Sequence, residues 1–360
     1  MSECNDNKCK CNGTKPKISV KIKARQAASN VSNDTELPDY KKVFTTLTLS
    51  DRIGGCKARW GIGRMRYIVK PGLYAVGSPL NESPVLVTAN YKLSFDALRK
   101  ELGGIDAWIL VLDTKGINVW CAAGKGTFGT AELVRQIRET RVSEVVSHRT
   151  LILPQLGAPG VSAHEVAKQA GFRVVYGPVR ASEVKAFIEA GLKASPEMRT
   201  VKFTTYDRLV LTPIEVVGTL KPLAIMLIVG FFLNYFAILS FGVWDLVGIL
   251  GAVFAGAVAT PVLLPWIPGR AFSFKGWFVG VVCTLILISV VGGGSGLYGL
   301  RSAAWLLILP MVSAFIAMNF TGASTYTSPT GVLKEMKIAL PIMIASAVAG
   351  IGLLVLGRFL

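Results

Sequence analysis

The chain has 360 residues, of which 51% are hydrophobic and only 17% are charged. Soluble proteins carry roughly 25% charged residues, so this composition excludes a disordered or fibrous chain and favours a membrane protein with clustered apolar residues. The apolar residues are clustered in the second part of the chain, because residues 221–360 contain only seven Lys/Arg and two Asp/Glu. Residues 1–220 contain 32 Lys/Arg and 20 Asp/Glu. The sequence therefore predicts a basic soluble domain followed by a membrane-embedded one.

The formal net charge of +17 raises the question of a nucleic-acid partner. The sequence has no basic-aromatic stripe and no nucleic-acid-binding motif, so we expect no nucleic acid and instead a basic face near anionic lipid headgroups. Six cysteines, unevenly placed, do not make a disulfide scaffold. The N-terminus has no apolar signal-peptide core, so we expect the soluble part to stay in the reducing cytoplasm.

Residues 1–40 are polar and read as a largely disordered tail. Within this tail, Cys4, Cys9 and Cys11 form a C-x4-C-x-C cluster. Thiolates of this spacing could hold a thiophilic metal, but no second pair completes a zinc site. The simpler alternative is a flexible tail with incidental thiols.

Residues 41 to about 193, within a predicted domain at 41–210, alternate short apolar runs with helical patterns, which predicts a mostly parallel α/β sheet. In such sheets ligands bind beyond the carboxyl ends of the strands, where Thr88, Cys121, Gln155 and Gly177 fall. The predicted strands are 85–88, 107–112, 117–120, 150–153 and 172–176, and the predicted helices are 94–102, 122–139, 163–169 and 181–190.

Residues 211–360 read as an all-α transmembrane domain with five spans, at about 221–241, 244–266, 275–292, 302–320 and 338–357. Each has close to the twenty apolar residues that a bilayer core of roughly 30 Å requires. With the N-terminal domain inside, the inner loops carry Arg270, Lys275, Lys334 and Lys337, against Arg301 and Arg358 outside. The positive-inside rule then predicts a multi-pass protein of the cytoplasmic (inner) membrane with its C-terminus outside.

The octapeptide NVWCAAGK at residues 118–125 is the most informative segment. A predicted strand ends at Trp120, and Cys121 stands at the start of the next helix, where backbone N–H groups stabilise an ionised thiol. Lys125, one turn later, adds positive charge. The small residues 122–124 are expected to leave the outer face of this turn bare, as a flat bulky ligand would require. A buried inert thiol remains the simpler alternative for Cys121.

Two other motifs overlap this turn. Gly124, Gly126 and Gly129 match the G-x-G-x-x-G dinucleotide fingerprint, but Glu144, at the required spacing, follows no convincing strand. A phosphate-binding P-loop is rejected because Val119 replaces its first glycine and Gly126 its Ser/Thr. Neither motif therefore defines the site.

The octapeptide resembles the hallmark motif of the HgcA family of mercury-methylating corrinoid proteins. The resemblance extends over most of the chain. Residues 87–93, 154–161 and 176–180 also resemble the corrinoid-binding domain of the corrinoid iron–sulfur protein's large subunit. In the apolar half, residues 319–322 and 324–328 are similar to the HgcA family. The D-x-H-x-x-G pattern of histidine-ligated corrinoid proteins is absent from the sequence.

This resemblance implies a Rossmann-like corrinoid-binding domain ahead of the five spans. It implies a base-off cobalamin over the carboxyl edge of the sheet, with Cys121 as the lower axial ligand to cobalt. Asn118 and Trp120 would frame the lower face of the ring. The cofactor-binding residues implied are Thr88, Asn118, Val119, Trp120, Cys121, Ala122, Ala123, Gly124, Lys125, Gln155, Gly157, Gly177 and Pro178; ordinary turn and strand-end roles remain open for Thr88, Gly157 and Gly177.

Three functions follow for comparison. The first is a cobalamin-dependent methyltransferase that passes a methyl group from methylcobalamin to inorganic Hg(II). Mercuric ion is an electrophile, so the methyl must leave with electron density, which a thiolate ligand would favour. The resemblance implies a ferredoxin-like iron–sulfur partner, HgcB, as electron donor, and a folate-linked methyl donor.

The second possible function is a methyl carrier of an acetyl-CoA-pathway type. The third, a transporter, is disfavoured because Asp245 is the one charge that could serve it, near a span end.

Overall fold

The computed structural model describes residues 39–291, 297–323 and 329–359. The predicted tail therefore lies outside the described residues, apart from Asp39 and Tyr40, and so do its three cysteines. The first strand begins at Tyr40. The segment 324–328, part of the resemblance, also lies outside them.

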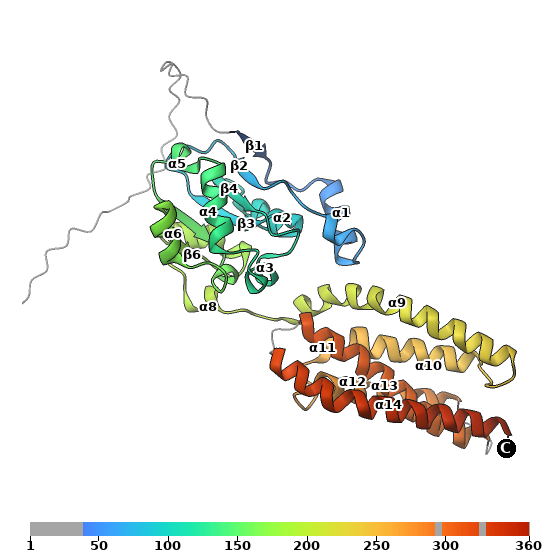
Figure 1. Ribbon diagram of the computed structural model, residues 1–360. Helices are drawn as coiled ribbons and strands as arrows, with labels where there is room; N and C mark the ends of the chain where they lie inside the picture. Colours follow the sequence, from blue (N-terminus) through green and yellow to red (C-terminus); the bar gives the residue numbers. More distant parts are fainter. Residues whose placement is uncertain (1–38, 292–296, 324–328, 360) are drawn as a thin grey trace, which may run out of the picture. The chain divides into compact units, whose positions relative to one another are not determined.

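The N-terminal part is an α/β structure around a six-stranded sheet (Figure 1). Its elements are β1 (Tyr40–Val43), α1 (Leu49–Arg59), η1 (Arg64–Arg66), β2 (Gly72–Val76), β3 (Val85–Ala89), α2 (Lys92–Arg99), η2 (Lys100–Leu102), β4 (Ala107–Leu112), α3 (Val119–Lys125), α4 (Thr130–Glu139), α5 (Val142–Val145), β5 (Thr150–Leu153), η3 (Gln155–Gly157), α6 (Ala163–Ala170), β6 (Arg173–Tyr176), η4 (Ala181–Glu183), α7 (Val184–Glu189) and α8 (Pro196–Arg199).

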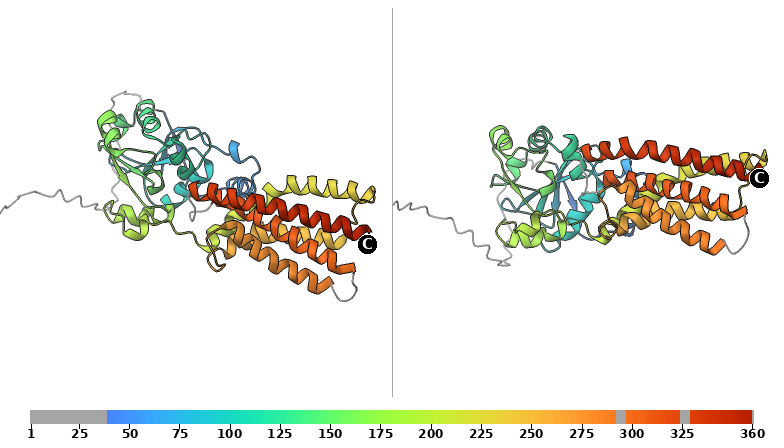
Figure 2. Two further views of the ribbon diagram at one scale, coloured as in Figure 1. Left: turned by 60° about the horizontal axis from the view of Figure 1, so that its bottom comes forward. Right: turned by 90° about the horizontal axis from the view of Figure 1, so that it is seen from below.

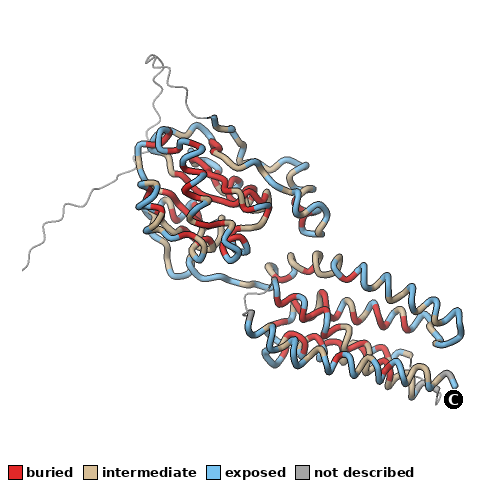
Figure 3. Tube along the Cα trace, viewed as in Figure 1, coloured by how far each residue is buried: buried red, intermediate tan, exposed pale blue. Residues whose placement is uncertain are grey.

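The strand order is β1-β2-β4-β3-β5-β6. All neighbouring pairs are parallel except β2 with β4, so the sheet is mixed rather than fully parallel. Strands β3 and β4 are buried along their whole length, as expected for central strands covered on both faces. Figure 3 shows this buried centre.

Helices cover both faces of the sheet. One apolar cluster joins Leu133 and Ile137 of α4 and Val166 of α6 to one face. A second cluster joins Phe95 of α2 and Phe187 of α7 to the other face. The result is a three-layer α/β architecture, which the two views of Figure 2 also display.

From the neighbouring strands β3 and β5, the chain continues toward opposite edges of the sheet. After β3 it passes through α2 to β4 on one side, whereas after β5 it passes through α6 to β6 on the other. The two strands are parallel neighbours, so a crevice opens between their carboxyl ends. This is the position at which open α/β sheets bind ligands.

Two predicted elements near this crevice are wrong. Residues 117–120 are not a strand, because Asn118 caps a helix that begins at Val119. The predicted helix 122–139 is two helices, since α3 ends at Lys125, capped by Gly126 with a left-handed φ of 79°, and α4 starts at Thr130. The remaining predicted strands and helices of this part match observed elements to within a few residues.

The C-terminal part is helical. Its elements are α9 (Thr205–Tyr235), α10 (Val243–Phe254), η5 (Ala255–Ala259), α11 (Thr260–Leu263), α12 (Phe272–Val291), α13 (Leu297–Asn319), η6 (Phe320–Ala323) and α14 (Pro329–Phe359). Among the described residues, five helical segments are long and apolar enough to cross a membrane. Helix α13 packs against α10, α12 and α14.

The first of these helices begins earlier than the sequence pattern predicts. Thr204 and Asp207 form a reciprocal capping box, so α9 starts at Thr205 instead of near residue 221. The predicted domain boundary at 210/211 therefore falls inside a helix.

Candidate functional site

Cys121 lies in the first turn of α3. The side-chain oxygen of Asn118 accepts a hydrogen bond from the Cys121 backbone N–H at 2.9 Å. The backbone N–H groups in the first turn of a helix have no acceptor within the helix. Asn118 supplies an acceptor for one of them, which is why the helix begins here. The thiol of Cys121 is free and exposed. A buried, inert thiol is therefore wrong for this position.

Four residues of α3 are exposed on its outer side. Trp120 is 43% exposed, and Cys121, Gly124 and Lys125 are also exposed. Trp120 and Gly124 are one turn apart, as are Cys121 and Lys125, so the four share one side of the helix. We call these four residues the α3 face. A Cβ built on Gly124 would meet nothing within 4 Å, so the surface between the indole and the amine is open.

The two alanines of the octapeptide do not lie on this face, contrary to the expectation of a bare turn made by residues 122–124. Ala122 and Ala123 are buried at 0% and 5% exposure, inside the cluster that covers the sheet. They are small because the chain behind α3 comes close to it. A Cβ on Gly160 would lie 3.0 Å from the Cα of Ala123 and 2.1 Å from the backbone oxygen of Phe128.

A pocket of about 300 Å³ opens beside the α3 face, at the carboxyl end of the sheet. Thr88, at the end of β3, and Pro154, after β5, form its floor together with apolar neighbours. The capping turn contributes Asn118, Val119 and Trp120. Further walls come from α2, which supplies Ser94, Ala97 and Leu98, and from residues 178–184, which supply Pro178, Val179, Ala181 and Val184.

The structure thus brings five of the predicted residues to one pocket. Thr88, Asn118, Val119, Trp120 and Pro178 all line it. Thr88 is buried, at 3% exposure, at the end of β3 where the pocket opens.

Eight predicted residues do not line the pocket. Cys121, Gly124 and Lys125 belong to the α3 face beside it, and Ala122 and Ala123 are buried behind that face. The other three, Gln155, Gly157 and Gly177, lie in the segments after β5 and β6. The N–H of Gln155 donates to the carbonyl oxygen of Pro178 at 3.4 Å, and the N–H of Gly177 donates to Leu153 at 2.8 Å. These bonds tie the loops after β5 and β6 together. Gly157 lies against Phe128, whose ring carbon would be 2.5 Å from an added Cβ. The three residues therefore shape the loops around the pocket.

Asn90, near the site, is a residue for which the sequence patterns predicted no role. It is 2% exposed, and its side-chain oxygen accepts bonds from the Thr114 N–H, the Thr114 hydroxyl and the Gly116 N–H at 3.1, 2.8 and 3.0 Å. Its amide nitrogen donates to Asp113 at 3.1 Å. Asn90 therefore fixes the loop that delivers the chain from β4 to α3. In the sequence, Asn90 could have been recognised as an amide side chain that directly follows a buried strand.

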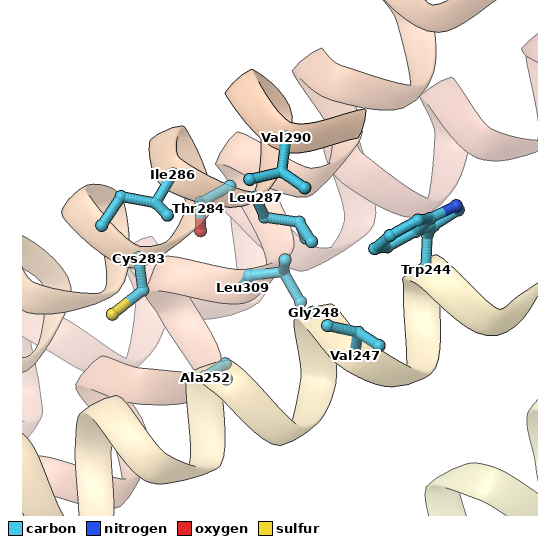
Figure 4. Close-up of a pocket in the computed structure, with 11 residues that line it drawn as sticks. Trp244, Val247, Gly248, Ala252, Cys283, Thr284, Ile286, Leu287, Val290 and Leu309 are labelled. Atoms are coloured by element: carbon cyan, nitrogen blue, oxygen red, sulfur yellow. The ribbon is translucent and has the colours of Figure 1, made fainter. Parts of the chain in front are cut away.

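A second pocket of about 240 Å³ lies among the apolar helices. Figure 4 shows its lining, in which Cys283 and Thr284 of α12 lie near Gly248 and Ala252 of α10. The other side chains around it are apolar or aromatic, among them Trp244 and Leu309. This lining offers no cluster of catalytic groups.

Asp245 is also in the helical part and is 7% exposed. It forms an ion pair with Arg301 and accepts a hydrogen bond from the Trp305 indole at 2.8 Å. A carboxylate committed to these partners is a structural anchor between α10 and α13.

Comparison with known proteins concerns the α/β part. Residues 63–188 match the family described as CO dehydrogenase/acetyl-CoA synthase delta subunit. The chain is 35% identical over 123 residues to the acetyl-CoA decarbonylase/synthase complex subunit gamma of Archaeoglobus fulgidus, covering 34% of this chain and 26% of the relative. The corresponding subunit of Methanopyrus kandleri is 38% identical over 124 residues, with 34% and 26% covered. The chain thus spans about a quarter of the length of these relatives.

The matched region 63–188 contains the pocket, the α3 face and Asn90. The long apolar helices lie outside it. By their names, these relatives belong to acetyl-CoA decarbonylase/synthase complexes, which agrees with the second function raised by the sequence. These names make no reference to mercury.

Proposed function

We propose that the α/β part binds a corrinoid and that the chain is a cobalamin-dependent methyltransferase. The observation that carries the proposal is an exposed thiol, Cys121, on an open helical face beside a pocket at the carboxyl ends of β3 and β5. Similarity to acetyl-CoA decarbonylase/synthase subunits and the resemblance of residues 118–125 to a corrinoid motif support it.

The residues present fit such a group. A flat macrocycle needs an unobstructed surface, and nothing stands within 4 Å of the position that a Gly124 side chain would occupy. Trp120 offers an aromatic surface on the same side, and Lys125 a positive charge. A pocket of about 300 Å³ is too small for a whole corrinoid, so it would take a peripheral part while the ring covers the α3 face.

When bound, the corrinoid supplies a methyl group on cobalt. Cys121 would hold the cobalt through its sulfur, and as a thiolate it would supply electron density to the metal. Thr88 and Pro178 would hold the ring edge or nucleotide tail in the pocket. Ala122 and Ala123 act indirectly, because their small side chains let α3 pack close to residues 157–160.

We propose Hg(II) as the methyl acceptor, since residues 118–125 resemble the mercury-methylating family and long apolar helices follow the α/β part. Donation from Cys121 suits transfer to an electrophile. The alternative is a methyl carrier of an acetyl-CoA-pathway type. The comparisons favour this alternative, because the relatives that they name are subunits of acetyl-CoA decarbonylase/synthase complexes.

We further propose that the five apolar helices span the cytoplasmic membrane with the α/β part, within residues 41–210, inside and the C-terminus outside. The chain would then receive electrons from a ferredoxin-like iron–sulfur protein of the HgcB type and methyl groups from a folate-linked donor. The described residues contain no cluster of metal-ligating side chains of their own.

The visible absorption spectrum of the purified, cobalamin-loaded protein tests the central proposal. Cys121→Ala should change the cobalt spectrum, because it removes an axial ligand. Cys56→Ala is the matched control, since Cys56 is also free and exposed but lies on α1, outside the pocket and the α3 face. Failure to take up cobalamin, or equal spectra for Cys121→Ala and the unaltered protein, would refute corrinoid ligation by Cys121.

The acceptor is tested separately. The protein loaded with methylcobalamin is mixed with Hg(II), and methylmercury is measured in one turnover. Free methylcobalamin and the loaded Cys121→Ala variant serve as controls. Formation above both controls supports mercury as the substrate. Retention of the methyl group in the presence of Hg(II) favours the acetyl-CoA-pathway alternative.

A further inference from the structure

Helix α1 turns its large apolar side chains outward. Leu49, Ile53 and Trp60 are 73%, 48% and 44% exposed, and the thiol of Cys56 is exposed as well. At about 100° per residue, these four positions fall within a sector of about 60°. They form an apolar stripe along the outer side of the helix. Figure 3 draws the trace of α1 largely as exposed or intermediate.

The side of α1 that faces the α/β core is made of small residues. Gly55 and Ala58 are the buried positions of this helix. A Cβ on Gly54 would lie 2.6 Å from the Tyr67 ring, and one on Gly55 would lie 3.1 Å from Leu93. Helix α1 therefore packs against the α/β core through glycine and alanine, and its large apolar side chains do not pack into that core.

The orientation of α1 is fixed by polar contacts. Thr48 and Asp51 form a capping box. Asp51 also forms ion pairs with Lys92 at 2.6 Å and with Arg99 at 2.8 Å, both on α2. The apolar stripe is thus held outward by a defined set of bonds.

Positive charge flanks the stripe on both sides. By the same helical geometry, Arg52 and Arg59 lie on one flank and Lys57 on the other. Residues 49–70 contain six Lys/Arg and one Asp/Glu, and that one acid, Asp51, is already bound to Lys92 and Arg99. None of the ion pairs between described residues includes Arg52, Lys57 or Arg59.

The turn after α1 extends the same pattern. Ile62 and Met65 are 62% and 63% exposed, Ile68 is 49% exposed, and Arg66 is exposed between them. Aliphatic and indole groups interleaved with unpaired cations are characteristic of segments that lie in a lipid headgroup region.

We propose that the α1 surface, made of Leu49, Ile53, Cys56 and Trp60 with the flanking Arg52, Lys57 and Arg59, rests on anionic lipid headgroups of the membrane. The proposal relies on the proposed membrane span of the apolar helices. Residues 1–38 are unsuited to cover this surface, because they carry seven Lys/Arg and four Asp/Glu and are themselves basic. Each cation near an anionic bilayer adds to the attraction, which falls off within a Debye length.

Cys56 provides a reporter on the stripe itself. The full chain, with its other five cysteines replaced by Ala, is labelled at Cys56 with a nitroxide and placed in nanodiscs of phosphatidylcholine, with or without phosphatidylglycerol. Electron paramagnetic resonance then compares collisions with oxygen, which enters lipid, and with a water-soluble nickel chelate. The control label is at Lys168→Cys, in a chain that also carries Cys56→Ala, since Lys168 is exposed on α6.

We expect nickel access at Cys56 to fall at least threefold below that at Lys168→Cys when phosphatidylglycerol is present. The triple variant Arg52→Gln, Lys57→Gln, Arg59→Gln should remove this protection. The matched triple Arg138→Gln, Lys168→Gln, Arg173→Gln, tested with the label at Cys56, should not, because its residues lie on α4, α6 and β6.

Equal nickel access at both labels would overturn the proposal. So would nickel exclusion that is independent of phosphatidylglycerol and of the three cations, since protein would then cover the stripe. Exclusion that appears only after an acidic partner protein is added would assign the surface to that partner and refute lipid. A chain that fails to enter the nanodiscs refutes the membrane span, whereas entry with an accessible Cys56 refutes the α1 surface alone.

Discussion

The carboxamide oxygen of Asn118 binds the backbone N–H of Cys121 at 2.9 Å and so sets where α3 begins. The residue that starts the helix is therefore also the one that positions the thiol three residues later. Asn118 lines the pocket as well, which couples the pocket wall to the orientation of the α3 face.

Asn118→Ala should loosen α3 without unfolding the domain. Loss of an N-cap costs about 1 kcal/mol, so the amides of residues 119–125 should exchange several-fold faster with deuterium. Hydrogen-exchange mass spectrometry measures this directly. Ser162→Ala is the control, because Ser162 caps α6 through the Glu165 N–H, and its effect should stay within α6. Unchanged exchange in α3 would show that the cap does not hold the helix.

Gly124→Ala separates stability from binding. Alanine is favoured over glycine inside a helix by about 0.5–1 kcal/mol, and the added Cβ meets nothing, so the fold should be unharmed or slightly stabilised. A methyl group on the α3 face should nevertheless weaken cobalamin binding at least tenfold, because it stands where a flat ligand would lie. Titration of the protein with cobalamin checks this.

Gly103→Ala is the control for that comparison, since its Cβ also meets nothing but lies away from the pocket. Its cobalamin affinity should be unchanged. Equal affinity for Gly124→Ala and the unaltered protein would contradict the placement of a ligand on the α3 face.

Asn90→Ala should be strongly destabilising. It leaves the Thr114 and Gly116 N–H groups without their acceptor, and an unpartnered buried polar group costs about 1–3 kcal/mol. Asn90→Asp keeps that acceptor but sets a carboxylate against Asp113. The double variant Asn90→Asp, Asp113→Asn restores a donor between the two positions and should recover much of the loss. Thermal unfolding of the three variants checks this order, and a double variant no better than Asn90→Asp would contradict it.

Sequence patterns located the parts of the fold that depend on local composition. Strands β3, β4 and β5 were predicted because they are nearly continuous apolar runs. Strand β1 was missed because its sequence, YKKV, is half polar and lies at an edge of the sheet. Residues 117–120 look like a strand because Ile, Val and Trp favour one, yet the Asn118 side chain begins a helix there.

The part of the site that the sequence predicted also depends on local sequence, because its residues lie at strand ends. Thr88 and Pro178 follow or end strands, and parallel strands deliver such residues to one edge. The role of Gly157 depends on the Phe128 ring, which comes from a distant part of the sequence. The inward direction of Ala122 and Ala123 depends on where α3 begins, which the predicted strand placed too late.

Asp51 gives the fold a defined response to acid. Burial alone would raise the pKa of this carboxyl, but hydrogen bonds from Lys92, Thr48 and Arg99 outweigh it and hold the pKa well below the ordinary value of 3.8. Because the folded pKa is depressed, the carboxylate stabilises the native state above the unfolded pKa. That stabilisation is lost as the pH falls below 3.8 toward the folded pKa.

Asp51→Asn should therefore lower the melting temperature at pH 7, where hydrogen bonds to a charged partner contribute about 2 kcal/mol. The difference from the unaltered protein should shrink as the pH is lowered through 3.8 to 3, because the unfolded chain then takes up a proton that the folded carboxylate, with its depressed pKa, does not. Scanning fluorimetry at each pH measures both melting temperatures. Glu82→Gln, at an exposed position, is the control and should leave the curve unchanged. A difference that stays constant down to pH 3 would show that Asp51 acts through packing and not through its charge.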